Sequence, residues 1–317
     1  MVNGIRKRIG IIFNFSHSWL GGVYYIQNII KGLNLLEDEI KPTIVIFHNE
    51  DLSGFAKEIN YTYLELVSWN FISIYKGYFL SWLFQKNLFI QDILDNFQLD
   101  GIYPLYDQPV SVKNKQIKIV AWFPDLQHKF YPKYFGFINL VFREIRLKLM
   151  LKNSNVLVVS SNDVASHFKK FYKIPSSCRI HVFPFISFVD GVNFENIDDL
   201  LVKYKLPKKY FIVSNQFYEH KNHIVVFKAL SILKEKNIKT HIVFTGKMDD
   251  YRNPLFIKEL ENKIIDFGIS EYVSLLGMIP RSDQLCLLKH SQAVIQPSLF
   301  EGWSTVIEDA NFQKNIR

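Results

Sequence analysis

The sequence has only two cysteines, Cys178 and Cys286, among its 317 residues. Two distant cysteines form neither a disulfide framework nor a four-cysteine metal site. Cys286 lies in the apolar run 285–288, where a thiol packs as a small apolar side chain. This cysteine usage is typical of a reducing compartment, so we expect a cytoplasmic protein.

The sequence also lacks an apolar run long enough to cross a membrane. A spanning helix needs about 20 predominantly apolar residues, and the nearest candidate, residues 69–84, is interrupted by Lys76. The basic N-terminus is followed by residues 9–15, a short run that contains Asn14. This run predicts a first β-strand rather than the apolar stretch of a secretion signal.

Arginine is scarce: eight Arg stand beside 30 Lys, and the net charge is +8 with a pI near 9.2. Lys, Asn, Ile, Phe and Tyr are abundant together, a combination that genome base composition can produce. A solvated lysine surface is therefore a simpler interpretation than an acidic partner. No nucleic-acid-binding motif is present, and we expect no nucleic-acid partner.

Short β-branched or aromatic runs alternate with helical apolar spacing along the whole chain. The predicted strands are residues 9–15, 43–47, 101–105, 117–122, 156–160, 180–183, 210–213, 241–245, 272–276 and 293–296. The predicted helices are residues 24–36, 75–97, 162–172, 222–236, 254–267, 282–290 and 304–312. Such alternation predicts an α/β protein with parallel sheets that helices cover on both faces.

A polar, acidic stretch near residue 190 separates two blocks of this alternation. We predict two doubly wound, Rossmann-like domains, residues 1–190 and 207–317, with a linker at 191–206. Such domains are expected to face a cleft, with ligands at the carboxyl ends of the strands. The second block stops inside its last predicted helix, so we expect an incomplete second domain in a truncated chain.

Gly21 and Gly22 lie between the first predicted strand and the helix that follows it. Glycines there let backbone N–H groups approach an anion, and a helix N-terminus adds positive potential. An ordinary glycine turn has the same sequence pattern. Neither G-x-G-x-x-G nor the P-loop pattern occurs, so neither NAD binding nor a P-loop nucleotide site is indicated.

Residues 214–223, SNQFYEHKNH, follow the first strand of the second block. Lys221 lies near the predicted helix N-terminus, where its ammonium group could meet a diphosphate. His220 and His223 have no third metal ligand nearby in the sequence. We therefore interpret them as part of a solvated turn rather than as a metal pair.

The most specific pattern is PSLFEGWSTVIEDA, residues 297–310. A strand is expected to end before it, Glu301 lies in a loop, and a helix is expected to begin at Ser304. Asp309 supplies a second carboxylate eight positions after Glu301, with Glu308 about 100° away around the helix. Carboxylates accept hydrogen bonds from vicinal hydroxyls, which suits a sugar or a ribose. A helix cap with surface acids is the simpler alternative.

This segment resembles the E-x7-E signature of the retaining GT-B glycosyltransferases of family 4, glycosyl transferases group 1. Further segments are similar to the same family, in the same order: Gly21-Gly22, residues 122–128 (WFPDLQH), 220–222 (HKN), 244–246 (FTG) and 275–280 (LLGMIP). The resemblance spans residues 9–312 and implies a GT-B fold.

The resemblance implies retaining transfer of a sugar from a nucleotide diphosphate donor, with no obligatory metal. The acceptor would be a glycan or a lipid-linked molecule in cell-envelope polysaccharide synthesis. Lys221 would neutralise the diphosphate, Glu301 would hold sugar hydroxyls, and Asp309 or Glu308 would hold the ribose. His128, with Asp125 beside it, would act at the sugar or the acceptor. The other donor-site candidates lie in or beside the matching segments: Gly21, Gly22, Asn215, Gln216, Gly246, Gly277, Met278, Ile279, Gly302, Trp303 and Ser304.

The chain departs from the family pattern where an arginine often precedes the lysine. Asn215 and Gln216 occupy that stretch, so Lys221 would act alone or with Lys247 or Arg281. The main alternative function is an inactive truncated remnant or a sugar-nucleotide-binding module. A GT-B sugar-nucleotide epimerase is a further alternative, which the E-x7-E segment disfavours.

Two segments, residues 61–89 and 130–152, combine dense aromatic side chains with lysines and arginines. This combination suits contact with a membrane surface, for which a lipid-linked acceptor would be a reason. Core packing beneath a hydrated lysine face explains it equally well. Under the first interpretation the protein is peripheral at the inner face of the membrane.

Overall fold

The computed structural model describes residues 6–15, 20–109, 117–184, 187–188, 196–250 and 252–314; residues 191–195 of the predicted linker lie outside these. The chain divides into two compact units, Met1–Phe185 (unit 1) and Ile186–Arg317 (unit 2). Each contains one fully parallel sheet with helices, which confirms the predicted α/β class. Among the described residues no helix is long and apolar enough to cross a membrane.

Unit 1 contains seven parallel strands in the order β3-β2-β1-β4-β5-β6-β7. The strands are β1 Arg8–Phe13, β2 Thr43–His48, β3 Leu64–Ser68, β4 Gly101–Tyr103, β5 Lys118–Trp122, β6 Val156–Val159 and β7 Arg179–Val182. The helices are α1 Leu20–Leu33, α2 Ser53–Lys57, α3 Ile74–Phe84, α4 Gln91–Asn96, α5 Gln127–Phe130, α6 Phe137–Asn153 and α7 Asn162–Phe171. Short 3-10 turns occupy Asp38–Ile40, Glu50–Leu52 and Pro132–Tyr134.

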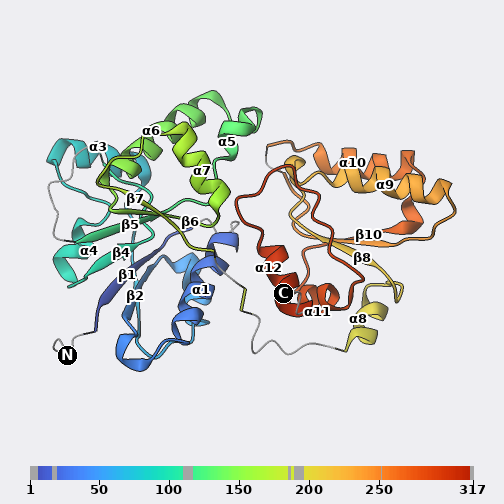
Figure 1. The fold of residues 1–317 in the computed structure, drawn as a ribbon, viewed down its shortest axis with the longest axis horizontal. Helices are drawn as coiled ribbons and strands as arrows, with labels where there is room; N and C mark the ends of the chain where they lie inside the picture. Colours follow the sequence, from blue (N-terminus) through green and yellow to red (C-terminus); the bar gives the residue numbers. More distant parts are fainter. Residues whose placement is uncertain are drawn as a thin grey trace. The chain divides into compact units, whose positions relative to one another are not determined.

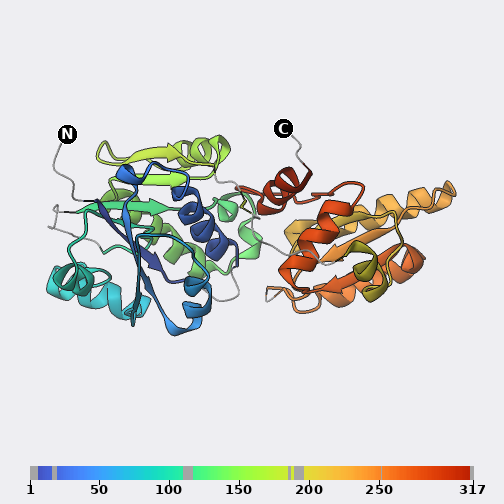
Figure 2. The same cartoon turned by 90° about the horizontal axis from the view of Figure 1, so that it is seen from below.

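The strand order of unit 1 reverses between β1 and β4, which makes it doubly wound. Right-handed crossovers place α1 and α2 on one face of the sheet and α3, α4, α6 and α7 on the other. Contact between Tyr75 of α3 and Phe142 of α6 agrees with this arrangement (Figure 1). Figure 2, viewed from below, shows α1 in dark blue in front of the strands of unit 1.

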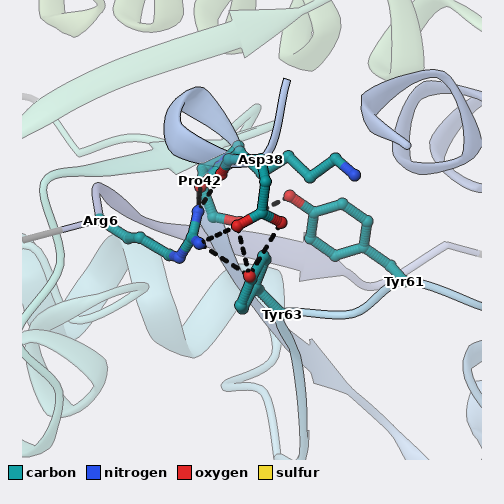
Figure 3. A network of polar contacts seen from close by, with 6 residues as sticks. Arg6, Asp38, Pro42, Tyr61 and Tyr63 are labelled. Atoms are coloured by element: carbon teal, nitrogen blue, oxygen red, sulfur yellow. Dashed lines mark hydrogen bonds and ion pairs between the residues drawn. The ribbon is translucent and has the colours of Figure 1, made fainter. Parts of the chain in front are cut away.

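A polar network joins the amino ends of the first three strands of unit 1 (Figure 3). Arg6 Nη2 donates to Asp38 Oδ2 at 2.6 Å, and the Tyr63 hydroxyl donates to both oxygens of the same carboxylate at 2.9 Å. The Tyr61 hydroxyl donates to the Pro42 carbonyl at 2.7 Å. These groups precede β1, β2 and β3, so the network fixes the end of the sheet opposite to its carboxyl edge.

Three parts of unit 1 differ from the sequence expectations. The helix expected at 75–97 is two helices, α3 and α4, because Gln85 adopts a left-handed conformation with φ 53° and ends α3. Strand β3 and helix α6 were not expected from the sequence. β3 lies in an aromatic-rich segment whose residues are mostly half-buried or exposed, so its apolar alternation is weak.

Unit 2 contains a three-stranded sheet in the order β10-β9-β8. The strands are β8 Phe211–Ser214, β9 Ile242–Thr245 and β10 Val273–Gly277. The helices are α8 Ile197–Lys203, α9 His223–Glu235, α10 Phe256–Asp266, α11 Arg281–His290 and α12 Thr305–Lys314, with 3-10 turns at Glu219–Lys221 and Ser270–Tyr272. The strand expected at 293–296 is reduced to one parallel bridge between Ile212 and Val294.

The core of unit 2 has two layers, one on each side of its sheet (Figure 1). Helices α9 and α10 pack on one side through Phe227 and Leu260. Helices α8 and α11 pack on the other side through Leu200 and Leu287. Helix α8 lies within the predicted linker 191–206, and its buried leucines pack it against unit 2.

Candidate functional site

The loops after the strands of unit 2 meet at the carboxyl edge of its sheet. Asn215 and Gln216 follow β8, Gly246 follows β9, and Gly277 ends β10. Residues 296–304 follow the bridged segment beside β8. The structure therefore brings most of the predicted donor-site residues to one edge of one sheet, because the strands are parallel.

Lys221 and Glu301 form an ion pair at this edge, with Nζ 2.6 Å from Oε1. Their side chains are 16% and 26% exposed, so the pair is partly buried and remains accessible to solvent. Two further bonds join the same loops: Leu299 N donates to His220 O at 2.9 Å, and Asn222 Nδ2 donates to Pro297 O at 3.1 Å. The cation and the carboxylate, 80 positions apart in sequence, are thus adjacent.

Gln296 holds the Glu301 carboxylate and was missed as a site residue in the sequence analysis. Its Nε2 donates to Glu301 Oε1 at 2.8 Å, and its Oε1 accepts from Asn215 Nδ2 at 2.9 Å. The same Nε2 lies 3.1 Å from Ser304 Oγ. Its place at the end of a predicted strand, directly before the PSLFEG segment, is the signal that could have identified it.

Glycine is required at Gly246 for two reasons. Its φ is +140°, and an added Cβ would lie 2.2 Å from the backbone oxygen of Asn215. Its N–H donates to the carbonyl of Gly277 at 2.9 Å, and Gly277 itself has φ +65°. The loops after β8, β9 and β10 therefore approach one another through backbone atoms, which no larger residue would allow.

The loop into α12 is shaped by Ser304, which caps the helix. Its Oγ accepts from Ile307 N at 3.3 Å, and its carbonyl accepts from Glu308 N at 3.1 Å. Gly302 and Trp303 precede it and are half-buried. Of the residues expected near a nucleotide base, Ile279 packs against the α8/α11 core, and Met278 is 61% exposed.

Asp309 and Glu308 occupy different environments. Asp309 is 1% exposed, and its Oδ1 accepts from Arg281 Nη2 at 2.6 Å and from Ser187 Oγ at 2.5 Å. Glu308 is half-buried, and its pKa is raised by burial and then by the neighbouring Asp309. In this structure the Asp309 carboxylate is enclosed, and Glu308 is the more accessible of the two acids.

The two cations considered as helpers of Lys221 already have acidic partners. Lys247 Nζ lies 2.8 Å from Asp249 Oδ2, and Arg281 is bound to Asp309. In this structure Lys221 is the cation that contacts the Glu301 carboxylate.

The interpretation of His220 and His223 as a solvated turn is wrong. His220 is 7% exposed and His223 is fully buried, with its ring stacked on Phe217 at a centroid distance of 4.5 Å. Burial, followed by the charge of Lys221, lowers the pKa of His220 to about 3 and that of His223 to about 4. Both imidazoles are neutral packing groups beneath the loop that carries Lys221.

In unit 1, Gly21 and Gly22 lie within the first turn of α1, which begins at Leu20, earlier than expected. The first four N–H groups of a helix have no partner inside it. The glycines therefore still offer backbone donors beyond the carboxyl end of β1, although Gly22 is buried.

His128 lies in a closed network around Glu144. The residue is buried; Nε2 lies 3.0 Å from Glu144 Oε1, and Nδ1 accepts from Arg143 Nε at 3.2 Å. Glu144 Oε1 also accepts from the Tyr172 hydroxyl at 2.9 Å and from Lys129 Nζ at 2.7 Å. Burial, followed by the charge of Arg143, lowers the pKa of His128 to about 4. A neutral ring that donates from Nε2 and accepts at Nδ1 suits a structural role.

Asp125 lies two residues before the first residue of the short helix α5. Its Oδ1 accepts from Gln127 N at 2.8 Å. No group of three or more His, Cys, Asp or Glu side chains placed to hold a metal ion occurs in the part of the chain that the structure describes.

The two parallel sheets with their covering helices have the fold of the GT-B glycosyltransferases. Three solved structures of similar fold each match 96% of this chain. Sucrose-phosphate synthase from Thermosynechococcus elongatus is 12% identical, with 79% of its chain covered and a TM-score of 0.66. The Anabaena HepE protein in complex with UDP and glucose is 15% identical, with 78% covered and a TM-score of 0.64. WaaG, a glycosyltransferase involved in lipopolysaccharide biosynthesis, is 12% identical, with 79% covered and a TM-score of 0.60.

At the level of sequence, residues 198–312 match the family model of glycosyl transferases group 1. The matched region contains Lys221, Gln296, Glu301 and both acids of α12. No curated protein sequence gives a significant match to the chain. The match to the family model therefore lies within unit 2, and the similar structures cover the fold of both units.

Proposed function

We propose that the chain is a retaining glycosyltransferase that moves a sugar from a nucleotide diphosphate donor to a glycan or lipid-linked acceptor. The observation that carries this proposal is the Lys221–Glu301 ion pair, 2.6 Å apart and held by Gln296. A cation for a diphosphate and a carboxylate for sugar hydroxyls are the two groups that such a donor needs. They lie side by side within the region that matches the family model.

The donor separates this pair when it binds. Lys221 turns to the diphosphate, whose negative charge grows as its bond to the sugar breaks. Glu301 accepts hydrogen bonds from hydroxyls of the sugar. Each charged group thereby exchanges one partner for another, and neither remains buried without a partner.

In the transfer step, the bond between the anomeric carbon and the diphosphate oxygen breaks. The acceptor hydroxyl oxygen bonds to the same carbon on the same face, which retains the configuration. The departing diphosphate oxygen takes the acceptor's proton, so no side-chain base is required. The buried, neutral ring of His128 supports a reaction without such a base. From unit 1 we assign to the N–H groups of Gly21 and Gly22 a contribution of positive potential.

For the nucleotide, we assign the ribose hydroxyls to Glu308 rather than Asp309, because Asp309 is enclosed by Arg281 and Ser187. We assign contact with the nucleotide base to the backbone around Gly277 and Met278. Asn215 acts through Gln296, and Gly246 allows the loops to approach.

We propose UDP-sugars as the first donors to test, because the similar HepE structure contains UDP and glucose. Similarity to WaaG, which is involved in lipopolysaccharide biosynthesis, supports an envelope glycan as acceptor. A lipid-linked acceptor would place the reaction at the inner, cytoplasmic face of a membrane.

Calorimetric titration of the purified chain with UDP, GDP and their sugars tests the donor site. We expect micromolar binding of one nucleotide and a loss of affinity of about 10- to 100-fold for Lys221→Ala, because a hydrogen bond to a charged group contributes about 1.5–3 kcal/mol. Lys208→Ala, at an exposed position outside the site, is the matched control and should bind normally.

Turnover is tested separately by NMR, which follows the consumption of the donor and the anomeric configuration of the product. Release of product with the donor's anomeric configuration supports the proposal, whereas an inverted product contradicts retention. A donor that binds tightly and is never consumed with any acceptor would favour the sugar-nucleotide-binding module instead.

A further inference from the structure

Helix α3 exposes apolar side chains along most of its length. The exposed residues are Tyr75 (78%), Phe79 (59%), Trp82 (59%), Leu83 (54%) and Phe84 (60%). Helix α6 exposes a second row at its N-terminal end: Phe137 (80%), Ile138 (84%), Val141 (45%) and Ile145 (50%). We call these nine residues the α3/α6 patch. A surface helix normally turns such side chains inward, so an outward apolar row needs a partner.

The two helices form one rigid platform within unit 1. The ring of Phe142 lies 5.7 Å from that of Tyr75 and 5.9 Å from that of Tyr78. Asp107 accepts from the Tyr78 hydroxyl at 3.1 Å and from Arg146 Nε and Nη2 at 2.6 and 2.7 Å. Since Tyr78 belongs to α3 and Arg146 to α6, this carboxylate fixes one helix against the other. The two exposed rows therefore lie on helices that are fixed side by side.

Lysines flank both rows. Lys76 lies one helical turn before Phe79 on α3, Lys86 follows the end of that helix, and both are exposed. Lys148 and Lys152 continue the row of Val141 and Ile145 and are also exposed. The patch is thus an apolar, aromatic surface whose ends are positive.

Acidic side chains do not balance these lysines on the two helices. Helix α3 has no acidic residue, and the single acid of α6 is Glu144. Glu144 is engaged with His128, Lys129 and Tyr172. The two helices together therefore carry a net positive charge.

The dimensions and charge decide between possible partners. Helix α3 has 11 residues and is about 16 Å long at 1.5 Å per residue. A bilayer core is about 30 Å thick, so this helix is too short to cross it and could only lie on its surface. A second copy bound through a two-fold axis would bring the same lysines towards one another. A surface of anionic lipids accepts both features, because apolar rings enter the headgroup boundary while ammonium groups remain among the phosphates.

We propose that the α3/α6 patch is a docking surface for a lipid bilayer that contains anionic headgroups. The helices lie on the membrane plane, with the aromatic side chains inserted and the lysines at the phosphate level. This inference goes beyond the proposed activity, because it requires neither donor nor turnover.

Vesicle co-sedimentation of the full chain tests the proposal. We expect strong binding to vesicles of phosphatidylcholine and phosphatidylglycerol in equal parts, and weak binding to phosphatidylcholine alone. The variant Phe79→Ser, Trp82→Ser, Ile138→Ser should lose at least about tenfold in partitioning, since interfacial binding scales with inserted apolar area. Because the three side chains are exposed, circular dichroism and nucleotide binding should not change.

Two matched controls separate the patch from general stickiness. Leu35→Ser, Leu255→Ser, Ile265→Ser removes three comparably exposed apolar side chains elsewhere and should bind vesicles normally. Lys76→Gln, Lys86→Gln, Lys148→Gln, Lys152→Gln should lose the preference for anionic vesicles, whereas exposed Lys208→Gln, Lys209→Gln, Lys236→Gln, Lys239→Gln should keep it.

Three results would overturn the proposal. The full chain could fail to bind either kind of vesicle, or the apolar control could lose binding as much as the patch variant. A dimer detected by sedimentation, if the serine substitutions at Phe79 and Trp82 dissociated it, would assign the patch to a second copy. If donor binding is retained in each case, the proposed transferase function is unaffected. Failure of the membrane-docking proposal can therefore be distinguished from failure of the proposed function.

Discussion

Unit 1 and unit 2 both gather charged side chains beyond the carboxyl ends of their strands, but in opposite ways. In unit 2, Lys221 and Glu301 lie on loops, and both remain partly exposed. In unit 1, the His128 side chain is 1% exposed, and its partner Glu144 accepts from three different residues. The comparison teaches that a charged pair outside the regular helices, with water access, can exchange partners, whereas a closed network on helices stabilises the fold.

Asp309 belongs to the closed kind although its sequence position lies in the E-x7-E segment, and it gives the largest expected effect. Asp309→Ala should lower the free energy of unfolding by about 3–5 kcal/mol, because it leaves the Arg281 guanidinium without its buried partner. Chemical unfolding measures this. Glu308→Ala is the control and should cost little stability while weakening nucleotide binding. Equal stability of the two variants would contradict the distinction between these acids.

Glu301→Gln breaks the open network of unit 2. Turnover should fall about 10²–10³-fold, because the amide keeps the shape but loses the charge that holds Lys221 and the sugar. Steady-state kinetics measures this, and the free energy of unfolding should change by less than about 1 kcal/mol.

Glu144→Gln is the matched substitution in unit 1 and should lower stability rather than turnover. It should cost about 1–3 kcal/mol of stability with turnover unchanged, since donors in the closed network lose a charged acceptor. If Glu144→Gln abolished turnover while the fold kept its stability, the His128 network would have to be placed in the active site.

Acidification should destabilise both units through their buried histidines. The folded-state pKa of His223 is lowered to about 4 and that of His128 to about 4, from an unperturbed value of 6.5. Between pH 6.5 and 4 these two histidines are protonated in the unfolded chain but remain neutral in the folded chain. The free energy of unfolding therefore falls as the pH falls.

His223→Phe isolates the contribution of unit 2. Neither ring nitrogen of His223 has a hydrogen-bond partner within the described residues, so an apolar ring on Phe217 should be tolerated. Unfolding at about pH 7 and about pH 5 should show a smaller loss for this variant than for the natural chain. An unchanged pH dependence would mean that His223 does not resist protonation in the fold.

Metal removal should have the smallest effect. In the proposed reaction the ammonium group of Lys221 supplies the positive charge at the diphosphate, so chelation with EDTA should leave turnover unchanged. Kinetics before and after chelation, with added Mg²⁺ as the control, measure this. A loss of activity that Mg²⁺ restores would show that the donor needs a metal in addition to Lys221.

Much of the fold could be predicted from the sequence because local periodicity is strong in particular segments. Helix α7 was expected at 162–172 and is confirmed at Asn162–Phe171, with Ser161 accepting from Val164 N as its cap. Strands β8, β9 and β10 are confirmed within one or two residues, because short β-branched runs stand between polar turns. Helix α6 was missed because its exposed face is apolar, which obscures the amphipathic pattern of a surface helix.

The candidate site was predictable only in part, because its contacts depend on tertiary pairing. The sequence placed Lys221 and Glu301 as separate candidates, and the fold makes them neighbours. The partners of Asp309 could not be foreseen, since Arg281 and Ser187 lie 28 and 122 positions away. The role of Gln296 likewise depends on Asn215 of a different loop.

Under the proposed function, the Lys221–Glu301 pair has a consequence for product release. Once the sugar has moved to the acceptor, a nucleoside diphosphate that stayed bound would hold Lys221 away from Glu301 and leave that carboxylate facing the phosphates. Its departure lets the two side chains meet again at 2.6 Å. In the proposed reaction the contact that the donor opens when it binds would therefore compete with the nucleoside diphosphate for Lys221 and favour its release.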